Sequence, residues 1–441
     1  MIRPDTIFAL SSGPGRAGIA VVRLSGTDVV LVLKALAGDL PKPRQAVVRT
    51  IRSRDGGDVI DQSLVLFFPG PASVTGEDVG EFHTHGSPAV VERLLGELAG
   101  FENCRPAEAG EFTRRAFQNE RLDLVEVEGL ADLLSSESEA QRRLAMRQFS
   151  GEASSIYHQW HSDLTGALAI IEASIDFADE DGVAADALAM VRPRLVALRD
   201  NFMAALQESG RAALVRRGLR IVIAGAPNVG KSSLLNALTG RRAAIVSEIA
   251  GTTRDVVEAP LVINGLAVSL SDTAGLRDTT DDTIEREGMV RSRLEIDGAD
   301  ILIWVTLAGE SAALPDRVPD LVVHNKSDLV SVDSIQLRND SHLAVSVKRG
   351  DGLEALRERL SFLVASHTNV SEQAVMVRSR HRTAVTESIR CLNDALSKRD
   401  DALELMAEDV RKAAHAMASI TGRIGVEDFL GRIFSEFCIG K

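Results

Sequence analysis

The sequence of 441 residues has only three cysteines, Cys104, Cys391 and Cys438. This number is too small for a disulfide framework and suits a reducing compartment, so we expect a cytoplasmic protein. No apolar run approaches the roughly 20 residues that cross a bilayer. The first residues, MIRPDTIFAL, lack the pattern of a cleavable signal. The sequence therefore predicts a protein without a membrane segment.

A surplus of basic residues is also missing. The chain has 63 Asp and Glu residues against 50 Lys and Arg, which gives a formal net charge of −13. Proteins that bind nucleic acid non-specifically carry broad basic surfaces. We therefore expect any contact with RNA to be local, or to be shared with a partner.

The most informative stretch of the sequence is LRIVIAGAPNVGKS, at residues 219–232. Residues 221–223 predict a short buried strand, and the residues after Gly230 predict a helix. A strand, a loop with the spacing G-x-x-x-x-G-K-S and a helix are the parts of a phosphate-binding loop. Loop N–H groups would surround a polyphosphate, Lys231 would reach the outer phosphates, and Ser232 would place a hydroxyl on Mg²⁺. A plain strand-to-helix turn is the alternative.

Further motifs follow in the order of a GTP-binding domain. GTTRD at 251–255 offers a threonine hydroxyl to the metal. DTAG at 272–275 offers a carboxylate that would support the metal from behind its direct ligands, and a glycine N–H to the γ-phosphate. NKSD at 325–328 reads the base, because Asp328 can accept two hydrogen bonds from guanine that adenine cannot donate. SVK at 346–348 is placed to support the other edge of the base. Together these motifs predict that the nucleotide is GTP.

One expected residue is absent from this set. Many GTPases have a glutamine after the D-x-x-G motif that orients the attacking water, and Leu276 stands there instead. Either hydrolysis is very slow, or another residue positions the water. Arg254 is a candidate arginine finger, and the side-chain carbonyl of Asn228 is a candidate ligand for a monovalent cation beside the β–γ bridge. The candidates for the water are acidic residues in the loop that follows, against the alternative of a solvated charge run: Asp281, Asp282 and Glu285.

The remaining sequence divides into segments of different pattern. Residues 1–118 predict a small α+β domain, and residues 217–372 alternate strand and helix around the phosphate loop. Residues 119–216 and 373–441 are helical, and each has an apolar face that needs a partner. We therefore predict one discontinuous helical domain with the nucleotide-binding domain inserted in it. Two separate bundles are the alternative.

Within these segments several elements are predicted individually. Strands are expected at 19–24 and 59–68, with a helix at 29–36 between them. In the nucleotide-binding segment, Asn264-Gly265 is a strong hairpin signal between strands at 256–262 and 266–270. One of these strands must be antiparallel at the edge of an otherwise parallel sheet. Further strands are expected at 301–305, 321–324 and 343–347, followed by a helix at 352–363.

Two groups of residues suggest metal ligation. His83 and His85 alternate within the polar segment at 73–88, as in a two-histidine site, but no cysteine cluster accompanies them. A structural role at the end of a strand is the favoured interpretation. The acidic run at 176–186 lacks the spacing of a calcium-binding loop, and a solvated turn between helices is favoured there.

Through these motifs and further segments, the chain is similar over its whole length to the MnmE (TrmE) family of tRNA-modifying GTPases. General GTPases share only the central motifs, so a terminal FCIGK after a split helical domain is the discriminating mark. The resemblance implies a multidomain fold with an α+β folate-binding N-terminal domain, a discontinuous α-helical domain and an inserted α/β P-loop GTPase (Ras-like) domain. The similar segments are DTIFALSSGPGRAGIAVVRLSG, SVTGEDVGEFHTHGSP, GEFTRRAFQNERLDL, PNVGKSSLLNAL, AAIVSEIAGTTRD and FCIGK.

The resemblance also implies an activity and partners. It implies a potassium-dependent GTPase that forms a homodimer and works with the FAD-containing protein MnmG. Together they would add an aminomethyl or carboxymethylaminomethyl group to C5 of the wobble uridine of certain tRNAs. The one-carbon unit would come from 5-formyltetrahydrofolate or a related folate, because side chains alone cannot carry it. GTP hydrolysis would drive a conformational step.

Site residues follow from matching positions in the family's motifs. The implied folate ligands are Arg23, Glu81, Arg121 and Lys441, where Arg121 stands in place of the family's usual lysine. The implied catalytic residues are Lys231 and Glu285, and Glu285 would position the water. The implied metal ligands are Ser232 and Thr253 for Mg²⁺, and Asn228, Ser247, Ile249 and Thr252 for K⁺. Cys438 is either a reactive thiol at the folate site or a small buried residue.

The motifs and the resemblance together give the residues predicted to bind GTP: Asn228, Val229, Gly230, Lys231, Ser232, Ser233, Ser247, Thr252, Thr253, Asp272, Thr273, Ala274, Gly275, Asn325, Lys326, Asp328, Ser346, Val347 and Lys348. Two functions from different classes are compatible with the sequence. The first is a tRNA-modification enzyme with a GTP-driven conformational step. The second is a regulatory GTPase whose outer domains bind RNA or ribosomes without modification chemistry.

Overall fold

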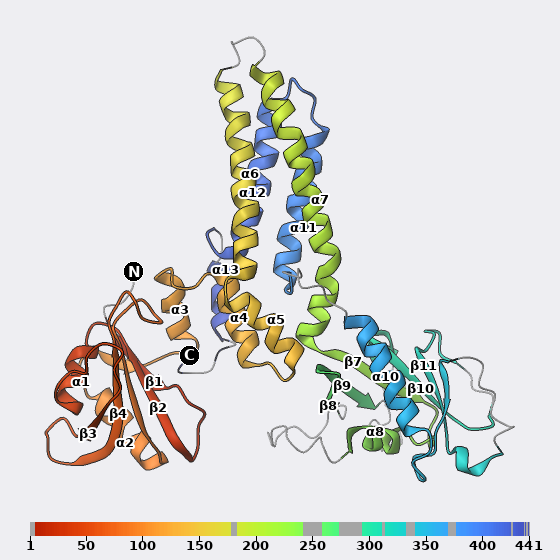
Figure 1. The fold of residues 1–441 in the computed structure, drawn as a ribbon, viewed down its shortest axis with the longest axis horizontal. Helices are drawn as coiled ribbons and strands as arrows, with labels where there is room; N and C mark the ends of the chain where they lie inside the picture. Colours follow the sequence, from red (N-terminus) through yellow and green to blue (C-terminus); the bar gives the residue numbers. More distant parts are fainter. Residues whose placement is uncertain are drawn as a thin grey trace, which may run out of the picture. The chain divides into compact units, whose positions relative to one another are not determined.

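The computed structural model in Figure 1 describes residues 5–177, 183–240, 258–272, 293–310, 314–331, 340–368, 376–424, 427–435, 437 and 440. The chain forms two compact units. Unit 1 comprises residues 1–134, 147–199 and 387–441, and unit 2 comprises residues 135–146 and 200–386. Within the described ranges, no helix is long and apolar enough to cross a membrane.

Unit 1 begins with a six-stranded sheet in the order β3-β4-β5-β2-β1-β6. β6 runs parallel to β1, and the other neighbours pair antiparallel. The strands predicted at 19–24 and 59–68 are confirmed as β2 and β4, whereas the polar pattern at 73–88 does not predict the central strand β5. The strands are β1 (Thr6–Leu10), β2 (Ala17–Ser25), β3 (Val47–Arg52), β4 (Val59–Phe68), β5 (Val79–Gly86) and β6 (Cys104–Pro106).

Helices cover this sheet unequally on its two faces. α1 (Val29–Ala37), which confirms the predicted helix, and α2 (Pro88–Ala99) pack their leucines and valines on one face. A side chain at Gly80 would come within 3.1 Å of Val29, so the missing side chain lets α1 lie close to β5. On the opposite face, α3 (Glu111–Gln118) places Phe112 against β1. On the part of this face over β2 and β5, here called the open face, the polar Arg23 and Glu81 lie beside the apolar Val21.

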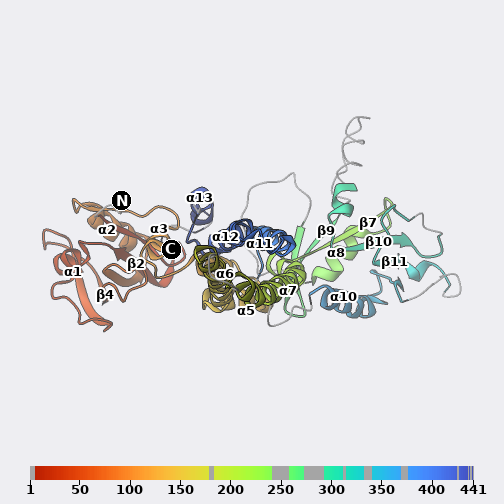
Figure 2. The same cartoon turned by 90° about the horizontal axis from the view of Figure 1, so that it is seen from above.

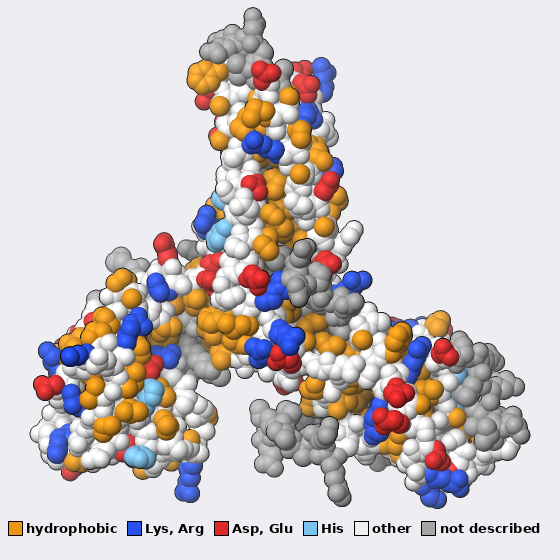
Figure 3. Space-filling model, in the orientation of Figure 1, with side chains coloured by type: hydrophobic (Ala, Val, Ile, Leu, Met, Phe, Trp, Pro, Cys, Tyr) orange, Lys and Arg blue, Asp and Glu red, His pale blue; other side chains and the backbone are white. Residues whose placement is uncertain are grey.

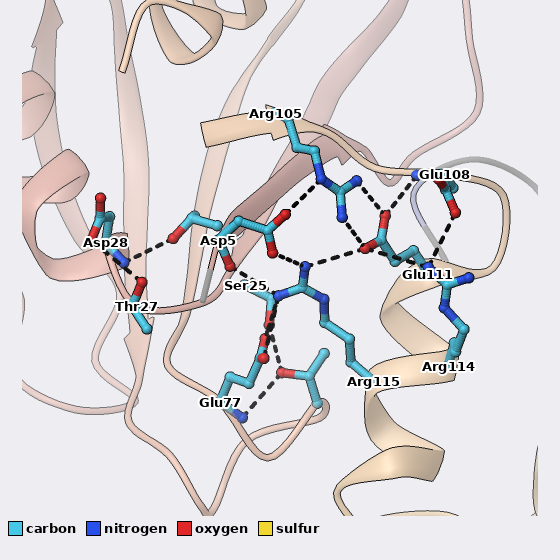
Figure 4. A network of polar contacts seen from close by, with 12 residues as sticks. Asp5, Ser25, Thr27, Asp28, Glu77, Arg105, Glu108, Glu111, Arg114 and Arg115 are labelled. Atoms are coloured by element: carbon cyan, nitrogen blue, oxygen red, sulfur yellow. Dashed lines mark hydrogen bonds and ion pairs between the residues drawn. The ribbon is translucent and has the colours of Figure 1, made fainter. Parts of the chain in front are cut away.

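A buried charge network fixes α3 to the sheet (Figure 4). The guanidinium of Arg115, with a side chain 5% exposed, contacts carboxylates of Asp5, Glu77 and Glu111 at 2.8, 3.1 and 3.2 Å. Arg105 on β6 adds two hydrogen bonds to Glu111, at 2.6 and 2.8 Å. Buried charges are tolerated only when they are paired in this way. The network therefore holds β1, β6 and α3 in one arrangement.

Unit 1 continues as a helical layer. Figures 1 and 2 show α6 (Glu152–Asp176), α7 (Val183–Arg217), α11 (Ser379–Ser397) and α12 (Leu403–Thr421) side by side. Arg192 of α7 donates to the Leu396 carbonyl at the end of α11 at 2.9 Å, and Arg411 of α12 pairs with Glu172 of α6 at 2.7 Å. Helices that precede the nucleotide-binding segment and helices that follow it thus share one bundle. The predicted discontinuous helical domain is confirmed.

Shorter helices join the bundle to the first domain. α4 (Leu124–Leu134) and α13 (Glu427–Ser435) enclose an apolar cluster with Phe117 of α3. Gly110, at the start of α3, has φ +67°, and a side chain there would come within 2.5 Å of the Phe434 carbonyl. The contact requires a residue without a side chain. α3 therefore contacts the sheet on one side and α13 on the other.

Unit 2 is built on a sheet in the order β12-β11-β10-β7-β9-β8. Among the described strands of this sheet, β8 alone runs antiparallel to its neighbour. It lies at the edge and joins β9 through Asn264 (φ 53°) and Gly265 (φ 78°). This confirms the predicted hairpin and its edge position, although residues 256 and 257 lie outside the described ranges. The strands are β7 (Leu219–Gly225), β8 (Glu258–Ile263), β9 (Leu266–Asp272), β10 (Ile301–Leu307), β11 (Leu321–Asn325) and β12 (His342–Ala344).

The last predicted strand, at 343–347, is shorter than expected. β12 ends at Ala344, and Ser346 forms an isolated bridge with Asp351. The chain turns there because Gly350 and Gly352 adopt φ of +86° and +72°. The helix that follows is α10 (Leu353–Thr368).

Helices lie on both faces of the second sheet. α8 (Lys231–Thr239) and α10 pack on the face that carries Ile221 and Ile223, together with α5 (Glu139–Phe149) and the last turns of α7. Ile296 and Ala299 cover the other face, against Val222 and its neighbours. Strands buried on both faces explain the continuous apolar runs in the sequence.

The surface carries both signs of charge. On the face drawn in Figure 3, Lys and Arg side chains alternate with Asp and Glu over the described parts of both units. Several exposed arginines, such as Arg142 and Arg143 on α5, pair with a neighbouring glutamate. The described part of this face therefore shows no broad basic area.

Candidate functional site

The phosphate loop connects the end of β7 to the start of α8, as predicted. Gly225 (φ 148°) lies against β10, and a side chain there would come within 2.1 Å of the Val305 carbonyl. Gly230 (φ 96°) begins α8, and a side chain there would come within 2.4 Å of the Asn325 amide nitrogen. Both positions combine close approach with a backbone conformation that favours glycine. The glycines of the motif thus set the shape of the loop.

Polar side chains gather at this end of the sheet. The Lys231 ammonium donates to the Ala226 carbonyl of the same loop at 2.9 Å. Ser232 Oγ donates to Asp272 Oδ2, at the end of β9, over 2.5 Å. Parallel neighbours β7 and β9 end at the same edge, which brings the two motifs together. Carboxylate and hydroxyl oxygens in this arrangement are ligands of the type that Mg²⁺ prefers.

The base-reading loop is bonded directly to the phosphate loop. Asn325 Nδ2 donates to the Val229 carbonyl at 2.8 Å in a buried setting. The ammonium of Lys326, which has φ 58°, donates to the Asn228 carbonyl at 2.9 Å. These two bonds fix the distance between the polyphosphate and base positions. The sequence places the motifs in order along the chain but does not reveal this coupling.

The Asp328 side chain is held by a hydrogen bond from Ser346, in the loop that follows β12. Ser346 Oγ, which is fully buried, donates to Asp328 Oδ1 at 2.7 Å. This hydrogen bond keeps the pKa of Asp328 below its ordinary value. The carboxylate is therefore ionised at neutral pH and can accept two N–H groups of a base. Val347 packs on the core of unit 2, and Lys348 is exposed.

Several predicted site residues lie outside the described ranges: Ser247, Ile249, Thr252, Thr253, Arg254, Thr273, Ala274, Gly275, Leu276, Asp281, Asp282, Glu285, Cys438 and Lys441. Residues 178–182, the middle of the acidic run at 176–186, lie outside the described ranges as well. The described members of the GTP set all belong to unit 2. Of these, Ser233 on the first turn of α8 and Lys348 are exposed, and the others take part in the contacts above.

A second polar site lies on the open face of the first sheet. Arg23 on β2 faces Glu81 on β5 across the strand pair, and its Nε donates to Glu81 Oε1 at 2.9 Å. The other carboxylate oxygen, Oε2, contacts His83 Nε2 at 2.8 Å. The polar pattern at 73–88 does not by itself connect His83 with this pair. Recognition of β5 as a strand would have done so, because residues 81 and 83 then share a face.

The two histidines of β5 contact different acids. His85 bonds to Asp61 through both its backbone N–H and its ring Nδ1, each at 2.8 Å. His83 instead contacts Glu81, in the interior of the sheet and not at a strand end as expected. Among the described residues, no group of three or more His, Cys, Asp or Glu side chains is arranged to hold a metal ion.

The end of the chain reaches the same sheet. Ser11 Oγ donates to the Gly440 carbonyl at 2.8 Å. Gly440 has φ +101°, and a side chain there would come within 2.2 Å of the Leu10 carbonyl. Leu10 pairs with Val22, next to Arg23 on β2. The last described residue therefore lies one strand from the Arg23–Glu81 pair.

Arg121 is not joined to this pair by any described contact. It is exposed in the turn after α3, where its backbone N–H bonds to the Ala116 carbonyl at 2.8 Å. Its side chain lies beside Gly76, where an added Cβ would be 3.3 Å from Arg121 Cγ. Of the four predicted folate residues, the structure brings together Arg23 and Glu81.

Two family models match the chain. The N-terminus of the GTP-binding protein TrmE matches residues 6–121, and the MnmE helical domain matches residues 124–438. Curated relatives called tRNA modification GTPase MnmE match end to end. The relative from Phenylobacterium zucineum is 47% identical over 99% of this chain and 100% of its own length, and that from Agrobacterium fabrum is 45% identical over 99% of both. The chain therefore belongs to the MnmE (TrmE) family.

Proposed function

We propose that this chain is a GTP hydrolase that acts in tRNA modification. The observation that carries the proposal is the bonded assembly of the three nucleotide motifs. Ser232 contacts Asp272, and Asn325 contacts the loop at Val229. Family membership links this nucleotide site to the tRNA modification named for the relatives.

The described residues fit a magnesium ion and a nucleotide. Ser232 presents a hydroxyl oxygen at the phosphate edge, and the Asp272 carboxylate that it contacts would orient this ligand. A bound Mg²⁺ would neutralise charge on the β- and γ-phosphates. The chain's own part is to hold the polyphosphate with loop N–H groups, to bring the Lys231 ammonium to it, and to fix the base through Asp328. Glu285 would orient the water in place of the missing glutamine.

The finer activity follows from the family resemblance. We propose that the chain forms a homodimer, works with the FAD-containing protein MnmG, and uses K⁺ held by Asn228, Ser247, Ile249 and Thr252. The product would be an aminomethyl or carboxymethylaminomethyl group on C5 of the wobble uridine. A cytoplasmic location accords with the three cysteines. The domain limits 1–118, 119–216, 217–372 and 373–441 stay predictions.

A folate at the open face of the first sheet would carry the one-carbon unit. A pterin ring presents an amino group and a neighbouring ring N–H, and a carboxylate such as that of Glu81 can accept both. The Arg23–Glu81 pair and the nearby chain end at Gly440 support this position. Lys441, next to Gly440, would supply a cation for the carboxylates of the folate tail.

The direct test is GTP hydrolysis by the purified chain. We expect hydrolysis in a buffer with Mg²⁺ and K⁺, and its loss in Lys231→Ala. Lys412→Ala is the matched control, because this exposed lysine of α12 pairs with Glu408 and lies in unit 1, which holds none of the described GTP residues. Equal hydrolysis by the Lys231 variant and the wild type, or none by the wild type, would overturn the proposal.

A further inference from the structure

His83 is a polar side chain that the nucleotide site leaves without a role. Residues 81, 83 and 85 of β5 alternate onto the open face of the first sheet. His85 is engaged by Asp61 through two bonds. His83 forms its polar contact with Glu81, at 2.8 Å. The two histidines therefore serve different partners, and only His83 belongs to the Arg23–Glu81 group.

Glu81 is held at both carboxylate oxygens. Oε1 accepts from Arg23 and Oε2 from His83, and the Glu81 side chain is 13% exposed. A free glutamate samples several rotamers, and its terminal torsion is broad. A donor at each oxygen removes this freedom before any ligand arrives. Such preorganisation raises the affinity for a ligand, because the side-chain entropy of Glu81 is lost on folding and not on binding.

The bonds leave acceptor capacity on the carboxylate. Each ionised oxygen has two lone-pair sites, and the hydrogen bonds from Arg23 Nε to Oε1 and from His83 Nε2 to Oε2 take one site on each. A ligand with two adjacent N–H groups needs one acceptor on each oxygen. Because an ionised carboxylate only accepts, His83 Nε2 must carry the hydrogen of this contact. The histidine thus orients Glu81 without using up its capacity.

We propose that His83 is a positioning residue of the folate site, which holds Glu81 ready for the amino-pyrimidinone edge of a pterin. This inference rests on the proposed folate function. It assigns to His83 a part in recognition of the pterin through Glu81, rather than a contact with the one-carbon unit.

Binding of 5-formyltetrahydrofolate to the full-length protein, measured by calorimetry, tests the proposal. We expect His83→Leu to weaken binding about tenfold, the effect of losing one hydrogen bond to a charged group. His83→Gln keeps a side-chain donor and should bind within about threefold of the wild type. His85→Leu is the matched control on the same strand face and should bind like the wild type. GTP hydrolysis and the melting temperature show that each variant is folded, and His83→Ala replaces His83→Leu if that variant does not fold.

A second ligand separates positioning from a general structural role. The 2-desamino-2-methyl analogue of the same folate lacks one of the two N–H groups. The wild type should prefer the natural folate strongly, and His83→Leu should lose a large part of this preference, since its Glu81 is no longer held. If all variants keep the wild-type affinity and preference, the role of His83 is refuted while the folate proposal stands. If the wild type binds no folate, the folate proposal itself fails.

Discussion

Gly230 shows how one residue can set the geometry of the nucleotide site. It adopts φ +96°, and the Asn325 amide nitrogen stands where its side chain would be, at 2.4 Å. Asn325 is also the residue that bonds to the loop at Val229. A methyl group here would displace the bond that joins the base-reading loop to the phosphate loop.

We expect Gly230→Ala to weaken GTP binding about tenfold or more, because the left-handed backbone and the displaced Asn325 each cost about 1 kcal/mol or more. Titration with a fluorescent GTP analogue measures this. Gly166→Ala in α6 is the control, since a side chain there meets nothing within 4 Å. Unchanged affinity in the Gly230 variant would show that GTP binding does not require this geometry of the phosphate loop.

Asp328 tests how the base is read. Its carboxylate accepts from Ser346 at 2.7 Å and stays ionised. An asparagine in its place can donate to a carbonyl, so Asp328→Asn should lose affinity for GTP and gain affinity for xanthosine triphosphate. Competition between the two nucleotides measures the preference. A variant that retains the wild-type preference for GTP would mean that Asp328 does not contact the base.

Asn228 tests the source of positive charge during hydrolysis. Its backbone carbonyl is held by Lys326 at 2.9 Å, and its side-chain carbonyl is a proposed ligand of K⁺. Hydrolysis should be much faster in K⁺ than in Na⁺, and Asn228→Ala should remove the difference, whereas Glu285→Ala should slow hydrolysis in K⁺ with GTP affinity nearly unchanged. Rates at matched ionic strength provide the comparison. Equal rates in both salts, with Arg254→Ala inactive, would assign the charge to arginine instead.

At the scale of elements, the attachment of α3 to the first sheet depends on ionised carboxylates that pair with Arg105 and Arg115. Burial is the largest single influence and acts to raise the pKa of Glu111, but hydrogen bonds from Arg105, the Glu108 N–H and Arg115, together with the charge of Arg105, lower that pKa to about 2. A carboxyl with a depressed pKa stabilises the fold above its ordinary pKa of 4.5 and loses this contribution as the pH falls toward 2. The contribution is of the order of 3 kcal/mol.

Thermal unfolding between pH 7 and pH 3 should therefore show a loss of stability on acidification that is smaller in Glu111→Gln. The variant should also be less stable than the wild type at pH 7, because Arg105 and Arg115 lose a charged partner. Glu152→Gln, at an exposed carboxylate of α6, serves as the control. Parallel curves for the Glu111 variant and the wild type would contradict the role of the network.

The elements that the sequence predicts well have local signals. The phosphate loop, the Asn264-Gly265 hairpin and α1 each combine an apolar period with glycine or turn residues. The sequence does not predict β5, because one face of the strand carries Glu81, His83 and His85, and this polar composition hides the opposite face with the buried Phe82. The contacts of Asn325 with Val229 and of Ser11 with Gly440 join residues far apart in the chain. No local pattern encodes such pairs.

At the scale of the whole molecule, the two ends of the chain meet. Phe437 is buried with Phe434 and Leu124, and Gly440 then lies on β1. Removal of residues 438–441 should leave the cluster around Phe437 intact. It should spare GTP hydrolysis and abolish both folate binding and tRNA modification. Calorimetry with 5-formyltetrahydrofolate and a GTPase assay on one preparation measure both effects. Wild-type folate affinity in the truncated chain would remove Lys441 from the folate site.

The most direct measurement of the central claim is the modified-nucleoside profile of tRNA from a strain that lacks this chain. We expect wobble uridines without the aminomethyl or carboxymethylaminomethyl group at C5. The wild-type chain should restore the modification, and Lys231→Ala should not, because GTP hydrolysis is required. An unchanged profile in the deletion strain, or full restoration by the Lys231 variant, would contradict a GTP-dependent role in tRNA modification.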